Sequence, residues 1–107
     1  MRHFQMVVVH RRDEFTGDFA SEPFEAAWAS EAIVFLRTEE ISYGGTIEAK
    51  AQISADGLNW IDEGTEFATQ TEPGNSFIRL RHFGGWLRIN GTVSGTAKIT
   101  LQIALKE

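Results

Sequence analysis

The chain has 107 residues, of which 42% are hydrophobic and 23% charged, and it contains no cysteine. This length supports a single domain, residues 1–107, and the composition excludes a disordered chain, disulfides and thiolate metal sites. The formal net charge of −5 argues against a nucleic-acid partner, and no apolar run approaches the roughly 20 residues of a membrane helix. The N-terminal stretch lacks a signal-peptide pattern, so we expect a soluble protein made in the cytoplasm, without a membrane partner.

Alternating apolar and polar residues predict β-strands along most of the chain. Apolar residues fall on both faces in residues 4–9 and 33–36, and on one face in residues 47–53, 78–80, 87–93 and 97–105. Turn residues separate these runs, at Thr16-Gly17-Asp18, Gly44-Gly45, Asp56-Gly57, Pro73-Gly74-Asn75, Gly84-Gly85 and Ser94-Gly95. The pattern predicts an all-β fold, an antiparallel two-sheet sandwich of about eight strands that is jelly-roll-like.

One segment, between Ser21 and Arg37, also fits a helix. Its apolar residues would line one helical face behind a cap at Ser21; they are Phe24, Trp28, Ala32, Phe35 and Leu36. The Glu22-Pro23 start and the β-rich surroundings favour two short strands instead. Both alternatives stay open from the sequence alone.

The stretch "SADGLNW", residues 54–60, is typical of a tight hairpin turn. Asp56 and Gly57 both tolerate a left-handed backbone, and Ser54 or Asp56 can hydrogen-bond locally. We interpret Asp56, Gly57 and Trp60 as a structural turn, with Trp60 packing over the edge of the core. The rival hypothesis is a calcium or sugar site built from Asp56, Asn59, Asp62 and Glu63, but calcium takes six to eight oxygen ligands and these four fall short.

Catalytic and metal-binding patterns are missing from the sequence. His3, His10 and His82 have no metal-ligand spacing, and we expect His82 at the end of a core-facing row. The carboxylate pairs Glu39-Glu40 and Asp62-Glu63 would point to opposite faces of a strand rather than act together. We therefore predict no catalytic residues, no metal and no cofactor.

The segment "FIRLRHFGGWLRIN", residues 77–90, predicts a hairpin around Gly84-Gly85. Its inner face would carry Ile78, Leu80, Leu87 and Ile89. Its outer face would form a candidate interface or ligand patch, made of Phe77, Arg79, Arg81, Phe83, Trp86 and Arg88. Arg81 would then lie opposite Arg88, and this repulsion calls for an anion. That anion could come from a neighbouring strand, through Glu39, Glu40, Glu48 or Glu66, or from another subunit.

Three stretches within residues 32–105 carry a resemblance: "AIVFL", "IEAKAQISADGLNWIDEGTEFA" and "FIRLRHFGGWLRINGTVSGTAKITLQIAL". Together they resemble small β-sandwich proteins encoded among phage and prophage virion genes. The resemblance implies a non-enzymatic structural or assembly protein that self-associates, with other virion proteins as further partners in a virion or virion-like particle. The Asp-Gly-x-x-Trp stretch also resembles discoidin-type domains, which implies a carbohydrate-binding module as the alternative.

The supply of apolar residues predicts self-association. The alternating strands already supply enough apolar residues to fill the core. The chain has five more, Val7, Val8, Val9, Ile33 and Phe35, so some of these must face outward. A second copy of the chain is the simplest cover for such a stripe. We therefore expect a homo-oligomer, and the virion resemblance favours a trimer.

Overall fold

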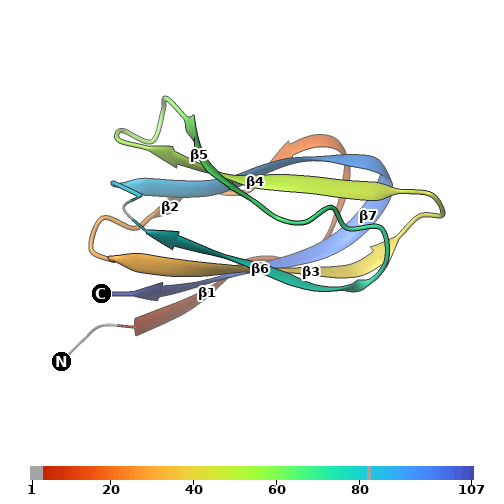
Figure 1. The fold of residues 1–107 in the computed structure, drawn as a ribbon, viewed down its shortest axis with the longest axis horizontal. Coiled ribbons are helices and arrows are strands. Elements are labelled where there is room, and N and C mark those ends of the chain that lie inside the picture. Colours follow the sequence, from red (N-terminus) through yellow and green to blue (C-terminus); the bar gives the residue numbers. More distant parts are fainter. Residues whose placement is uncertain (1–3, 82) are drawn as a thin grey trace.

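A computed structural model of the chain describes residues 4–81 and 83–107, and these contain seven strands and no helix. The strands are β1 (Phe4–Ala20), β2 (Phe24–Glu25), β3 (Glu31–Ile41), β4 (Thr46–Ser54), β5 (Ile61–Glu66), β6 (Gly74–Arg81) and β7 (Trp86–Lys106) (Figure 1). The predicted all-β class is confirmed. The segment between Ser21 and Arg37 forms strands and not a helix. No helix able to span a membrane occurs in the described part.

All strand pairs are antiparallel, and they join into one hydrogen-bonded sheet. The order is β5-β4-β7-β3-β6, and β1 and β2 also pair with β7. Because β1 follows β7 along both of its halves, β3 and β4 lie end to end on the other side of β7. The sequence predicted about eight strands in two sheets; the described residues form seven strands in one continuous antiparallel sheet that is nearly barrel-like, and two separate sheets are not confirmed.

The sheet folds over on itself at a bend in its two longest strands. In β7 the bend falls at Gly95, whose φ is 87°, where an added Cβ would collide with the Ser42 hydroxyl. The register of β1 shifts at the same level, between Phe15 and Gly17, and Gly17 has a φ of 73°. The turns predicted at Gly17 and Gly95 are therefore bends inside continuous strands (Figure 1).

The core lies between the two halves of the folded sheet. Apart from Gly95, the odd-numbered residues of β7 from 87 to 105 are all buried. They face inward rows from the other strands, which are Ala32, Val34 and Leu36 on β3, Ile47, Ala49 and Ala51 on β4, and Ile78 and Leu80 on β6. A single apolar cluster thus holds both halves together.

The hairpin predicted around Gly84-Gly85 is wrong. β6 pairs with β3, and its Arg81 lies beside Glu31, whereas Arg88 lies beside Gln52 of β4. The connection from β6 to β7 crosses between the halves of the sheet and takes Phe83 into the core, where it is 2% exposed. The Arg81–Arg88 repulsion therefore does not arise. His3 and His82, the latter expected at the end of a core-facing row, lie outside the described residues.

Gly91, in the first half of β7, lies where β4 and β1 approach β7 closely, and a substitution there tests this packing. A Cβ there would lie 2.5 Å from the carbonyl oxygen of Glu48 and 2.9 Å from the ring of Phe19. We predict that Gly91→Ala lowers the free energy of unfolding by about 1–3 kcal/mol, because backbone must shift to admit the methyl group. Urea denaturation measures this. Gly74→Ala, in open space on β6, is the control and should cost nothing; equal midpoints for the two variants would contradict the packing described.

Candidate functional site

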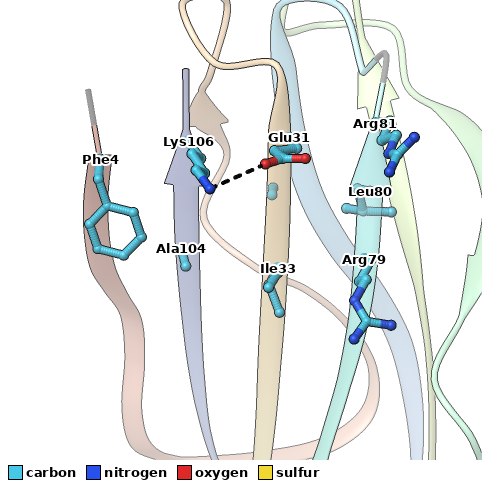
Figure 2. Close-up of a pocket in the computed structure, with 9 residues that line it drawn as sticks. Phe4, Glu31, Ile33, Arg79, Leu80, Arg81, Ala104 and Lys106 are labelled. Carbon is cyan, nitrogen blue, oxygen red and sulfur yellow. Dashed lines mark ion pairs between the residues drawn. The ribbon is translucent and has the colours of Figure 1, made fainter. Parts of the chain in front are cut away.

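One half of the sheet presents an outer side built from β1, the second half of β7, β3 and β6. The strand register arranges its outward residues in three rows of four across these strands. The rows are Phe4, Lys106, Glu31 and Arg81; then Met6, Ala104, Ile33 and Arg79; then Val8, Gln102, Phe35 and Phe77. We call these three rows the outer face. Figure 2 shows most of the first two rows side by side.

The outer face is the most apolar surface of the described residues. Five of the eight large hydrophobic side chains that are exposed belong to it, namely Phe4, Met6, Val8, Phe35 and Phe77. Phe4 is 62% exposed and Phe77 is 49% exposed. The alternation explains this, since Val34 and Leu36 fill the core while Phe35 between them points out. The sequence has apolar residues on both faces of residues 4–9 and 33–36, and those that point outward form much of the outer face.

Cationic groups lie along one edge of the outer face. The Arg79 guanidinium carbon lies 5.0 Å from the centroid of the Phe77 ring, and that ring lies 6.4 Å from Phe35. Among the described residues, neither Arg79 nor Arg81 has a carboxylate partner. Lys106 Nζ and Glu31 Oε1 are 3.9 Å apart, at the limit of an ion pair, as the dashed line in Figure 2 marks. The face thus combines apolar area with positive charge.

Two open hollows mark this face. One, of about 390 Å³, lies between the first two rows and is lined by residues from all four strands, including Phe4 and Arg81. The other, of about 360 Å³, is lined by Phe35, Phe77 and Arg37 among others. No group of three or more potential metal ligands occurs in the described part of the chain. The chemistry available on the face is apolar burial and recognition of anions.

The patch predicted from residues 77–90 is divided between three places. Phe77, Arg79 and Arg81 belong to the outer face, whereas Phe83 is in the core. Trp86 and Arg88 lie on the other half of the sheet, paired with β4. The sequence reading missed that Phe4, Met6 and Val8 complete the face from β1, although apolar residues on both faces of residues 4–9 were the available signal.

Arg88 and Trp60 form a second, smaller cluster. The Arg88 guanidinium carbon lies 4.5 Å from the centroid of the Trp60 ring, and Arg88 Nε donates a 2.7 Å hydrogen bond to Gln52 Oε1. The adjacent turn rests on Trp86, since a Cβ at Gly57 would lie 3.2 Å from its ring. Trp60 therefore stacks on an arginine rather than on the core edge. This cluster offers an aromatic surface with a hydrogen-bonding cation.

The turn around Asp56 is held by hydrogen bonds to its carboxylate. The backbone N–H groups of Leu58 and Asn59 and the Asn59 side-chain amide each donate at 2.9 Å, and the Ser54 hydroxyl donates at 3.0 Å. These donors, the Asn59 backbone first, hold the pKa of Asp56 far below its usual range. Hydrogen bonds from Gln52 and Lys50 likewise lower the pKa of Asp62. Both carboxylates are thus engaged within the chain.

No protein-family model matches this sequence, and no curated protein matches it. Several solved structures share its fold. The SPBc2 prophage-derived protein YomS has a TM-score of 0.67 at 10% identity, over 100% of this chain and 96% of that one. A structure of the Gx strain of infectious bursal disease virus also reaches 0.67, at 8% identity, over 99% of this chain and 33% of the viral one.

The chain shares its fold with a prophage-derived protein and with proteins of infectious bursal disease virus, among them VP2 of the subviral particle. A further similar structure is the pre-peptidase C-terminal domain of a Bacillus anthracis collagenase, with a TM-score of 0.55 at 12% identity, over 96% of this chain and 89% of that one. Because the identities are this low, the likeness shows the fold and nothing about activity.

The turn yields a prediction on pH. The lowered pKa of Asp56 means that its carboxylate form stabilises the fold above about pH 4, and that this stabilisation is lost as the pH falls further. In Asp56→Asn the amide oxygen still accepts the backbone bonds but carries no charge. We therefore expect wild-type protein to melt at a higher temperature than Asp56→Asn at neutral pH, with the difference shrinking on acidification.

Thermal melts followed by circular dichroism, from neutral pH to about pH 2, measure this difference. Glu72→Gln is the control, because the Glu72 side chain makes no hydrogen bond or ion pair with the described residues. A wild-type advantage over Asp56→Asn that stays constant with pH would show that the charge plays no part in the turn.

Proposed function

We propose that this chain is a non-enzymatic structural protein of virion type, which self-associates through its outer face. The observation that carries the proposal is the gathering of five exposed large hydrophobic side chains on one side, beside two arginines without a carboxylate partner in the described part. Phenylalanine, methionine and arginine are enriched at protein interfaces, and an apolar patch on a soluble protein marks an interaction site.

The shared fold supports this proposal. A prophage-derived protein and a viral particle protein have the same arrangement of strands, the first over nearly its full length. We interpret the folded-over sheet as a jelly-roll-like sandwich with two outer sides, of which, among the described residues, only the outer face is strongly apolar. Other copies of the chain are the first partners, and other virion proteins the next. The chain would be soluble when made in the cytoplasm, and then join a virion or virion-like particle.

Enzymatic activity has no support from the site geometry. The hollows on the outer face are open rather than deep. Besides apolar side chains and arginines, the first is lined by Glu31 and Lys106, and the second by the uncharged polar residues Asn75, Ser76 and Gln102. Neither side chain of the pair Lys106–Glu31 is deeply buried, which leaves both groups in contact with water. A role in assembly therefore fits the geometry better than catalysis.

A carbohydrate-binding module is the second candidate, and the Trp60–Arg88 stack is the observation that favours it. Sugars pack on aromatic rings and accept hydrogen bonds from arginine. Under our proposal the wild-type protein is not retained on polysaccharide resins. Retention that is lost in Trp60→Ala and kept in Tyr43→Ala, which changes an exposed aromatic residue in the turn between β3 and β4, would establish the carbohydrate function instead.

Self-association is tested by light scattering across a concentration series. We predict a mass that is a multiple of the 12.0 kDa monomer; the virion resemblance favours a trimer, whereas the two-fold contact argued below requires a dimer. Phe35→Ser should weaken association by about tenfold or more, because it removes an exposed aromatic ring from an inner strand of the outer face. Tyr43→Ser, away from that face, is the matched control. A monomer whose mass is unchanged at high concentration would refute the proposal.

A further inference from the structure

We propose that two copies of the chain pack outer face on outer face, about a two-fold axis that runs parallel to the strands between β7 and β3. This inference rests on the proposed self-association and names its contact. In the second copy, such an axis reverses the strand order β1-β7-β3-β6 across the contact. Positions along the strands are unchanged, so each row faces the same row of the second copy. Residues of β1 then meet residues of β6 in the second copy, and residues of β7 meet those of β3.

The first row becomes charge-complementary under this operation. Lys106 meets Glu31 of the second copy, and Glu31 meets Lys106 of the second copy, so the same pair forms twice. Within one chain these two groups are only loosely paired, at 3.9 Å, and their side chains are 50% and 44% exposed. Both are therefore free to turn toward a partner. At the ends of the row, Arg81 meets the ring of Phe4, a cation over an aromatic face.

The second row and the ends of the third row become complementary in size, and in the middle of the third row Gln102 meets the ring of Phe35. Ala104, a small side chain, meets Ile33 of the second copy, and Ile33 meets Ala104. Val8 meets Phe77, and Met6 meets the aliphatic part of Arg79. Large and small side chains interdigitate in this way when two sheets pack about 10 Å apart. Sheets also cross at about 30°, and the pairs from β7 and β3 tolerate this because they lie nearest the axis.

The other face-to-face arrangement is worse. An axis that runs across the strands at the second row would place Arg79 against Arg79 of the second copy, which is a like-charge contact. It would also place Glu31 against Phe35, so the carboxylate would be covered by an aromatic ring and would keep only its loose 3.9 Å pairing with Lys106 of its own chain. Burying a charge that is so weakly paired is costly. The residues of the face thus select the axis parallel to the strands.

The area of the outer face indicates how tightly two copies of the chain should bind. Four strands about 4.8 Å apart and three rows about 7 Å apart give a surface of roughly 20 Å by 20 Å. This falls at the lower end of specific interfaces, so we expect self-association in the micromolar range. Arg79 and Arg81 lie on the edge strand β6, at the rim of such a dimer, and there they keep contact with water.

The test is a charge-reversal exchange, measured by sedimentation equilibrium at physiological salt. Glu31→Lys places a second lysine against Lys106 of the other copy, and Lys106→Glu places two glutamates together. Each variant alone should associate about tenfold more weakly than wild type, or worse, because the repulsion occurs twice. An equimolar mixture should recover a dimer with one chain of each kind, since every contact is then complementary. The double variant should dimerise by itself.

The pair Glu40–Lys98 is the matched control, because it joins the same two strands, at 3.3 Å, outside the three rows. Glu40→Lys and Lys98→Glu should leave association within about twofold of wild type, since charges beyond the Debye length of about 8 Å are screened. Circular dichroism verifies that every variant is folded. Recovery of a dimer in the mixture is a second check, because only folded chains can form that dimer.

The remaining outcomes separate the two proposals. If the wild-type protein associates but the reversals at Glu31 and Lys106 have no effect, or the mixture fails to recover a dimer, the two-fold contact is wrong and self-association stands. A trimer also means that the two-fold contact is wrong, because that contact closes at two copies. A wild-type protein that remains a monomer contradicts the proposed function itself.

Discussion

The strand β7 is the constraint on which the rest of the fold depends. It runs unbroken from Trp86 to Lys106 and pairs with β1, β2, β3 and β4, so most of the sheet is hydrogen-bonded to this one strand. A strand of this length cannot serve one compact core unless it bends, and the bend requires the positive φ of Gly95, where the Ser42 hydroxyl leaves no room for a side chain. Because the inward alternation is preserved across the bend, both halves of β7 line the same core.

The periodicity of two predicted the individual strands well, because it depends only on which side of each strand is buried. Strand pairing was harder to predict. Gly84-Gly85 between two alternating runs is locally consistent with a hairpin, yet β6 pairs with β3 and β7 pairs with β4, since these partners close the core. The same limit applies to Gly17 and Gly95, because a glycine with positive φ marks a turn or a bend equally well, and only the nonlocal pairing decides between them.

In the candidate site too, the sequence indicated which residues point outward but not which strands lie side by side. Apolar residues on both faces of residues 33–36 indicated from the sequence that some of them must point out, and Phe35 does. The sequence could not show that β1 and β6 flank this strand pair and bring Met6 and Arg79 into one row with Ile33, because that row joins segments from opposite ends of the chain. Phe83 was misplaced for a related reason: its position in the alternation pointed outward, but the crossing connection buries it.

The edges of the sheet explain why a face and not an edge is the surface for association. β1 pairs only with β7 in the described residues, yet its free edge is interrupted by three register shifts and by the left-handed backbone of Arg12 and Gly17, which blocks regular strand addition. β2, which also pairs only with β7 among the described residues, is two residues long. The edge strands at the two ends of the order, β5 and β6, approach each other where the folded sheet nearly closes, and β5 is also kinked at Gly64, with a φ of 109°. Extension of the sheet by another chain is thus disfavoured at each edge, which leaves the apolar outer face as the surface best able to bury area against a second copy.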